Sequence, residues 1–313
     1  MRIALAILGL ALVVAHMLLP TNLLERPELA QMILVELRLP RTLLAIGYGL
    51  SLGMAGAALQ AIFANPLASP DITGASAGGA LGAVTVAYLF GLSSAVAMAI
   101  GGAVGAGAAL ILLFLIAGRS ADPARLLLAG LAIALAAGSA TALMLALAPS
   151  PYAFYDAWRW LMGSLVDRSL GQAAAALVPA LVACALLWKD RKAYDLIALG
   201  DDVLASLGIE PRRLANRTML LAAIATGACV ALCGAIGFVG LIAPIIARHL
   251  TKGHPGRAIL PAGLLGAGVL LFADLVVRFA PAGRDIPIGV VTSLIGTPIF
   301  ILVLARLPRG ART

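Results

Sequence analysis

Charged side chains at helical spacing are the first candidates for chemistry in this chain. Asp274 and Arg278 lie four residues apart in the otherwise apolar stretch FADLVVR, so they share one face of a predicted helix. Arg38 and Arg41 lie three apart around a Leu-Pro pair. Ionisable groups within a membrane span are costly and usually face protein, water or each other. The pattern allows either a local Asp274–Arg278 ion pair at a helix end or an Arg278 that presents its charge outward.

The remaining reactive side chains do not suggest a catalytic or metal-binding set. The sequence contains no P-loop, HExxH or GxSxG motif, which argues against ATP hydrolysis by that route and against an intramembrane enzyme. His249 and His254 lie five apart across a loop that contains a glycine, which is poor geometry for a metal. Cys229 and Cys233 lie inside an apolar run, where packing is favoured over a metal pair. We predict no catalytic residue, metal site or cofactor.

Membrane-spanning helices are the elements that must position these residues. Of the 313 residues, 62% are hydrophobic and 12% are charged, whereas soluble domains carry about 25% charged residues. The net charge is +8, and Lys and Arg lie in short loops between apolar runs. This distribution favours a lipid bilayer rather than nucleic acid as the partner of the basic residues.

Apolar runs bounded by charges or by Pro and Gly predict an all-α fold with about ten spans. We expect one transmembrane domain over residues 1–313. The eighth run is too short to cross a bilayer alone, so we expect a half-helix or a broken span. The predicted spans are residues 3–20, 41–63, 73–90, 94–117, 125–148, 172–188, 217–238, 239–250, 257–280 and 287–305.

The distribution of Lys and Arg predicts the orientation. With the N terminus in the cytoplasm, ten alternating spans put 15 of the 22 basic residues inside and 7 outside. This bias favours two cytoplasmic termini. We expect the first apolar run to be a retained span rather than a signal peptide, because it is long and lacks a clear small-x-small cleavage site.

Two segments are candidates for structural turns or gates. Asn65 and Pro66 open a Pro-bounded turn, NPLASPD, after the second apolar run. In GAIGFVGLIAP, the glycines include Gly237 and Gly240, and Pro244 follows them. An undisturbed helix is not compatible with this pattern, so we expect a break or a re-entrant turn.

Three polar segments are long enough for short helices outside the spans. Residues 21–40, on the predicted outer side, leave room for a surface helix. Residues 149–170, on the same side, are rich in Tyr and Trp, which suits either an interfacial anchor or a gate or partner contact. Residues 189–217 form the longest polar stretch, in which Asp201 and Asp202 open an amphipathic piece. This piece suits either contact with a cytoplasmic partner protein or a membrane-surface linker, and its apolar side would consist of Leu204, Leu207 and Ile209.

The sequence resembles the FecCD-type permeases, which are membrane subunits of bacterial ABC importers for iron–siderophore complexes, haem and cobalamin. The similarity extends from Arg38 to Leu304. The matching motifs, in order, are RLPR (38–41), GAALQAIFANPLASPDITG (56–74), LLLAGLAIAL (126–135), WLMGSL (160–165), LIALGDDVLASLGI (196–209), GAIGFVGLIAP (234–244), FADLVVR (272–278) and DIPIGVVTSLIGTPIFI (285–301).

This resemblance implies a type II ABC importer permease in the bacterial inner membrane. Two permease copies, expected to be a homodimer, would form one pathway, with two ATPase subunits on the cytoplasmic side and a substrate-binding protein on the periplasmic side. The cargo expected first is an iron(III)–siderophore complex, with cobalamin or haem as alternatives. The resemblance assigns binding-protein docking to Arg38, Arg41 and Arg278. It assigns ATPase coupling, within residues 189–217, to Asp201, Asp202, Ala205, Leu207 and Gly208.

Three positions depart from the family pattern. Ile245 stands where the family usually has a histidine, and Ala64 and Ser69 stand where it often has arginine and aspartate. An ion pair at the NPLASPD turn is therefore lost. A stand-alone secondary transporter, with Asp274 and Arg278 as an ion-coupled site, remains the alternative from a different class.

Overall fold

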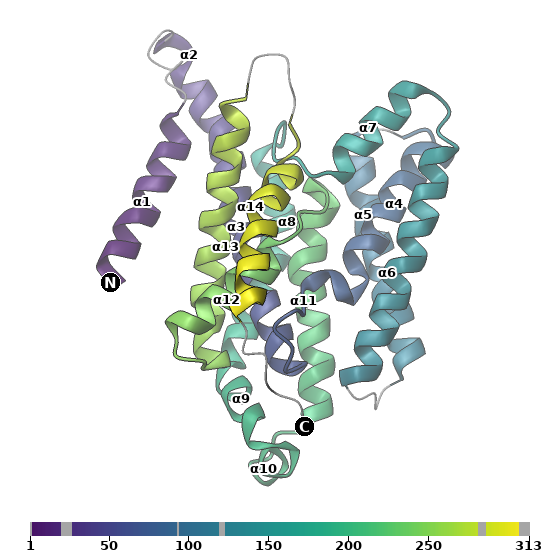
Figure 1. Ribbon diagram of the computed structural model, residues 1–313. Coiled ribbons are helices and arrows are strands. Elements are labelled where there is room, and N and C mark those ends of the chain that lie inside the picture. The colour runs from purple at the N-terminus through teal and green to yellow at the C-terminus, as the bar shows by residue number, and fades with distance from the viewer. Residues whose placement is uncertain (1, 20–26, 93, 119–122, 281–285, 307–313) are drawn as a thin grey trace.

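The computed structural model describes residues 2–19, 27–92, 94–118, 123–280 and 286–306, and these residues are mainly helical with no strand among them (Figure 1). Several helices begin where the sequence supplies a cap or a proline. Ser169 accepts a hydrogen bond from the backbone of Gln172, whose side chain bonds back, to form a capping box. Proline lies in the first turn of α3 (Leu39–Ile62), α11 (Pro211–Cys233) and α13 (Pro255–Arg278), where its missing N–H costs nothing.

The predicted set of about ten spanning helices is confirmed within the described residues. Six helical stretches are long and apolar enough to cross a membrane, and four apolar helices are shorter. In chain order they are α1 (Arg2–Leu18), α3 (Leu39–Ile62), α4 (Ala75–Leu89), α5 (Ala95–Ala117), α6 (Pro123–Ala146), α8 (Leu170–Lys189), α11 (Pro211–Cys233), α12 (Val239–Leu250), α13 (Pro255–Arg278) and α14 (Ile288–Arg306).

Short helices mark the two ends of the molecule (Figure 1). At one end lie α2 (Pro27–Met32) and α7 (Pro151–Leu161), and we call this the α7 end. At the opposite end lie α9 (Arg191–Leu196), η4 (Ile197–Leu199) and α10 (Asp201–Ser206), and we call this the α10 end. The predicted surface helix within residues 21–40 is not a separate element, because α2 runs through a π-helical turn, η2 (Ile33–Arg38), directly into α3.

Backbone-to-backbone contact holds α3 against its neighbours. A Cβ atom on Gly53 would meet the carbonyl group of Ala262 in α13, and one on Gly56 would meet that of Gly240 in α12. Small residues permit this close approach, which replaces the hydrophobic drive that lipid does not supply. Bulky substitution at either glycine would force α3 away from these partners.

The predicted interruption lies immediately before α12. α11 ends at Cys233, Gly234 has φ +76°, and Phe238 has φ +67° just before α12 begins. Tyr48 of α3 donates a hydrogen bond to the Gly234 carbonyl at 3.0 Å, so the exposed backbone is satisfied within the protein. Pro244, in contrast, does not break the chain: it is buried inside α12, although it removes the helical partner of the Gly240 carbonyl.

A second interruption separates α3 from α4. Ala64 adopts φ +45° and the Asn65 side chain accepts a hydrogen bond from the Leu67 amide at 2.8 Å, which reverses the chain. The chain then runs back along α3 before a 3-10 turn, η3 (Pro70–Thr73), and α4 begins only at Ala75. The predicted turn is therefore confined to the first residues of NPLASPD, and its second half re-enters the helix bundle.

Candidate functional site

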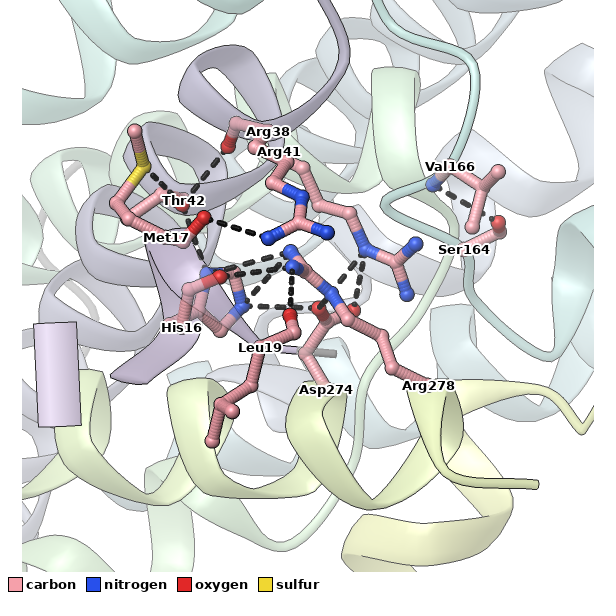
Figure 2. A network of polar contacts seen from close by, with 10 residues as sticks. All are labelled: His16, Met17, Leu19, Arg38, Arg41, Thr42, Ser164, Val166, Asp274 and Arg278. Atoms are coloured by element: carbon pink, nitrogen blue, oxygen red, sulfur yellow. Dashed lines mark hydrogen bonds and ion pairs between the residues drawn. The ribbon is translucent and has the colours of Figure 1, made fainter. Parts of the chain in front are cut away.

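At the α7 end, several helices direct polar side chains at one carboxylate, Asp274 of α13 (Figure 2). Arg41, in the first turn of α3, donates from Nε to both carboxylate oxygens at 3.0 and 2.8 Å. Arg278, one turn after Asp274, donates from Nε to Oδ2 at 3.1 Å. His16 of α1 places Nε2 2.9 Å from the same oxygen. We call these residues, together with Arg38 and Thr42, the Asp274 cluster.

Two arginines of the cluster also donate hydrogen bonds to the last carbonyl groups of α1. Arg278 donates from Nη1 to the His16 carbonyl at 2.7 Å, and Arg38 donates from Nη1 to the Met17 carbonyl at 2.8 Å. The last carbonyl groups of a helix lack intrahelical partners and carry partial negative charge, so guanidinium groups are favourable there. These bonds fix the end of α1 against α3 and α13.

Thr42 connects the histidine to the backbone of the cluster. His16 Nδ1 lies 2.7 Å from the Thr42 hydroxyl, and that hydroxyl donates to the Arg38 carbonyl at 2.7 Å. The Thr42 hydroxyl therefore bridges the His16 ring and the Arg38 backbone. His16 is fully buried, at 0% exposure, so this connection holds α1 and α3 together inside the protein.

The cluster is rich in positive charge and largely enclosed. Among the residues drawn in Figure 2, Asp274 supplies one carboxylate against the guanidinium groups of Arg38, Arg41 and Arg278. The exposed fraction of the side chain is 2% for Asp274, 7% for Arg278 and 17% for Arg41. Arg41 is therefore the most accessible member of the Asp274–Arg41–Arg278 group. A partly exposed, net cationic group of this kind attracts anions.

The structure brings together all three arginines that the resemblance assigns to docking. The local Asp274–Arg278 ion pair is present, and the Arg278 side chain is mostly buried in it. The sequence patterns did not indicate that His16 and Thr42 belong to the Asp274 cluster. A histidine alone in an apolar run is a usable signal, because such a residue needs a polar partner when it is buried.

At the α10 end, η4, α10 and the residue after α10 present apolar side chains to solvent. Leu199, Val203 and Leu207 are spaced at four residues and are 57%, 39% and 57% exposed. Leu204 points the other way and is buried, so the predicted apolar side is divided between the core and the surface. Gly208, with φ +77°, ends this helix. The predicted coupling residues with described side chains are exposed: Asp202, Ala205, Leu207 and Gly208.

Specific polar contacts attach α9, the short helix that precedes α10 and η4, to the spans. The Asp195 carboxylate accepts a hydrogen bond from the Gly256 amide, at the start of α13, at 2.8 Å. The Tyr194 hydroxyl lies 3.0 Å from that of Thr218 in α11. Burial raises the pKa of the Tyr194 phenol, so the hydroxyl remains protonated and available for this bond. α9 therefore forms a fixed joint from which α10 projects.

The positions that depart from the family pattern have simple environments. Ile245 is buried inside α12, and its carbonyl lies 2.8 Å from His249 Nδ1 one turn later. Ala64 is exposed at the turn, and Ser69 is half-buried.

Among the described residues, no group of three His, Cys, Asp or Glu side chains is arranged to hold a metal ion.

Comparison with known proteins defines the class as a membrane permease of the ABC importer type. The chain is 38% identical to the Fe(3+)-citrate import system permease protein YfmE of Bacillus subtilis, over 91% of this chain and 85% of that protein. It is 38% identical to the vitamin B12 import system permease protein BtuC of Vibrio cholerae, over 89% and 84%. It is 36% identical to the ferric enterobactin permease protein FepD of Escherichia coli, over 89% and 83%.

The fold comparison agrees with the sequence comparison. A solved structure described as an inward-facing metal-chelate type ABC transporter matches with a TM-score of 0.88 at 28% identity, over 97% of this chain and 98% of that one. The model of the FecCD transport family matches residues 2–306. The chain therefore belongs to the FecCD transport family.

Proposed function

We propose that this chain is the permease subunit of a binding-protein-dependent importer that moves an iron(III) chelate across a bacterial inner membrane. A separate subunit hydrolyses the ATP. The observation that carries the proposal is the family match along residues 2–306, together with relatives named for iron(III) citrate and ferric enterobactin. An iron(III)–siderophore complex is the cargo that we put first.

A cobalamin is the second candidate cargo. The Vibrio cholerae vitamin B12 permease is as similar to this chain, at 38% identity, as the iron(III) citrate permease of Bacillus subtilis. Binding measurements on the partner binding protein, with a ferric siderophore, ferric citrate and cobalamin in parallel, distinguish these candidates. Micromolar or tighter affinity for cobalamin alone would replace the iron assignment.

The Asp274 cluster supports a docking role for Arg38, Arg41 and Arg278 at a periplasmic α7 end. Acidic side chains on a binding protein would approach Arg41, the most exposed member of its ion-pair group. Each exposed contact between opposite charges contributes at most about 1 kcal/mol, so docking needs several of them. A homodimer of permeases doubles the number of clusters.

The α10 end supports a coupling role on the cytoplasmic side. Residues 189–217 contain a fixed joint at α9 and an exposed row formed by Leu199, Val203 and Leu207. An apolar row outside the membrane is suited to a groove on a partner protein. We assign the row, with Asp201, Asp202, Ala205 and Gly208, to contact with two ATPase subunits, which puts both termini of the chain in the cytoplasm.

The two interruptions support gating. Asn65 and Pro66 start the re-entrant segment before α4, and Gly237, Gly240 and Pro244 surround the start of α12. Pro70 packs against Gly240, so the two interruptions touch each other. A helix that ends inside the bundle can shift its end with less disturbance than a continuous one.

The test is reconstitution of the complex in lipid with its ATPase and binding protein. We expect ATP-dependent uptake of the bound chelate and stimulation of the ATPase by the loaded binding protein. Leu207→Asp should abolish both, while Leu250→Asp, an exposed apolar position at the end of α12, should keep them. Uptake by the permease alone, driven by an ion gradient, would refute the proposal.

A further inference from the structure

Asp71 is an ionisable residue that lies between the α7 end and the α10 end of the molecule. It belongs to η3, the 3-10 turn between α3 and α4. Its side chain is exposed within the described chain, while Pro70 and Thr73 of the same turn are buried. A residue that is accessible and yet surrounded by buried neighbours lies in a recess of the surface.

Packing places this turn near the middle of the helix bundle. Pro70 lies against Gly240, which adjoins the carbonyl of Leu52 in α3. Leu52 lies 10 residues before the end of α3, about 15 Å at 1.5 Å per residue. The hydrocarbon core of a bilayer is about 30 Å thick, so this level is close to its centre.

A second helix gives a similar depth independently. The carbonyl of Ile72, next to Asp71, packs against Gly130 in α6, where a Cβ atom would clash with it. Gly130 lies 7 residues after the first residue of α6, or about 10 Å. Both estimates therefore put Asp71 roughly 10 to 15 Å inside the ends of the spans.

A carboxylate at this depth is not stable against lipid. Charged groups in the hydrocarbon region are costly and face protein, a partner charge or a water-filled cavity. The ion pairs found among the described residues involve Asp190, Asp274 and Glu210, and not Asp71. An accessible Asp71 therefore needs water or a second protein surface in front of it.

We propose that Asp71 lines the water-filled translocation pathway near the middle of the membrane and turns its carboxylate toward the passing chelate. This inference rests on the proposed function of the chain as an importer permease. A carboxylate accepts hydrogen bonds from hydroxyl, amide or ammonium groups on the outer surface of a chelate. It also gives the pathway a negative potential, which favours cationic over anionic solutes.

Exposed apolar residues on the same segment support a pathway surface. Leu67, four residues before Asp71, is 46% exposed. Val182 of α8 supplies a matched contrast, because it is 57% exposed and lies at the same depth. The depth follows from Cys184, two residues later, whose sulfur lies 3.5 Å from the hydroxyl of Ser51, the neighbour of Leu52. We take Val182 to face lipid, because its surroundings on α8 form a continuous apolar stripe.

Cysteine accessibility in the reconstituted complex tests the proposal. Asp71→Cys and Val182→Cys are treated with charged methanethiosulfonate reagents, and the wild-type protein, whose three cysteines are buried, is the blank. We expect Asp71→Cys to react at least about tenfold faster than Val182→Cys, because a thiolate forms only where water reaches it. If Asp71→Cys does not assemble, Leu67→Cys supplies the same comparison. Equal, slow reaction of the loop and α8 cysteines would overturn the proposal, since lipid or protein then covers the segment.

The charge of the carboxylate is tested separately. Leu67→Cys should react severalfold faster with a cationic than with an anionic reagent, and Asp71→Asn in the same chain should remove this preference. An unchanged preference for the cationic reagent in the Asp71→Asn protein would overturn the proposal that the Asp71 carboxylate faces the pathway. Neither experiment uses cargo, ATP or binding protein, so failure here leaves the importer function intact, whereas failure of ATP-dependent uptake leaves the accessibility result intact.

Discussion

The two ends of the molecule organise charge in opposite ways. At the α7 end, Arg41 and Arg278 turn inward to Asp274, and the contacts lie between helices that are distant in sequence. At the α10 end, the pair between Glu210 and Arg213 is local and exposed, with side chains that are 59% and 84% accessible. The pair between Asp190 and Arg217 connects α8 and α11 there and is partly exposed, at 15% and 45%.

This contrast implies that the two contact surfaces proposed above differ in kind. A buried network fixes the positions of its guanidinium groups before any partner arrives, so the loss of side-chain entropy on docking is small. The α10 end instead presents the exposed apolar side chains of Leu199 in η4, Val203 in α10 and Leu207 directly after α10. Its contribution to binding would come from removal of apolar surface from water.

The largest expected effect is at Asp274. Asp274→Asn removes the charge that compensates Arg41 and Arg278, and an uncompensated buried charge typically costs about 3–5 kcal/mol. We expect a clear fall in the thermal unfolding temperature in detergent. Glu210→Gln at the exposed pair is the matched control and should leave the unfolding temperature almost unchanged. Similar losses in both variants would erase the contrast between the ends.

A smaller loss is expected where α9 joins α13. Asp195→Ala removes the acceptor for the Gly256 amide, and a hydrogen bond to a charged group contributes about 1.5–3 kcal/mol. Asp195→Asn keeps an acceptor oxygen and should lose less. Thermal unfolding of both variants measures the difference, and equal stability of the two would mean that this bond does not hold the joint.

The sequence predicted the number and order of the spans well, because hydrophobic runs and charges report the membrane directly. It also predicted the break before α12 from its glycines. The predicted short eighth run, residues 239–250, is α12, and Pro244 is accommodated inside it because the helix begins only five residues earlier. Whether a proline breaks a helix depends on tertiary packing that one segment does not contain.

The Asp274 cluster was predictable only in part. The spacing of Asp274 and Arg278 predicted their ion pair, since it depends on one helix. The contact of Asp274 with His16 joins residues 258 positions apart, and no local pattern encodes it. The depth of Asp71 was missed for the same reason: the turn motif predicts a reversal of the chain, but not how far the chain then re-enters the bundle.

A third prediction separates stability from partner contact at the α10 end. Leu207→Ser changes an exposed position and should alter stability by less than about 0.5 kcal/mol. Retention of the ATPase subunit should fall roughly tenfold, because about 1.4 kcal/mol of apolar burial is lost. Leu204→Ser, at the buried position of the same helix, should instead lower the unfolding temperature. A Leu207→Ser protein that retains the ATPase normally would remove the apolar row from the interface.

The smallest expected effect is that of salt on the two kinds of charge. Exposed ion pairs contribute about 0.2–1 kcal/mol and are screened, so a double-mutant cycle with Glu210→Gln and Arg213→Gln should give a coupling that vanishes near 1 M salt. The corresponding cycle with Asp274→Asn and Arg41→Gln should give a larger coupling that persists, because the Asp274 side chain is only 2% exposed. Unfolding temperatures at low and high salt measure both cycles. If salt weakens both couplings equally, the Asp274 cluster is open to solvent in the working protein and is not a prearranged docking surface.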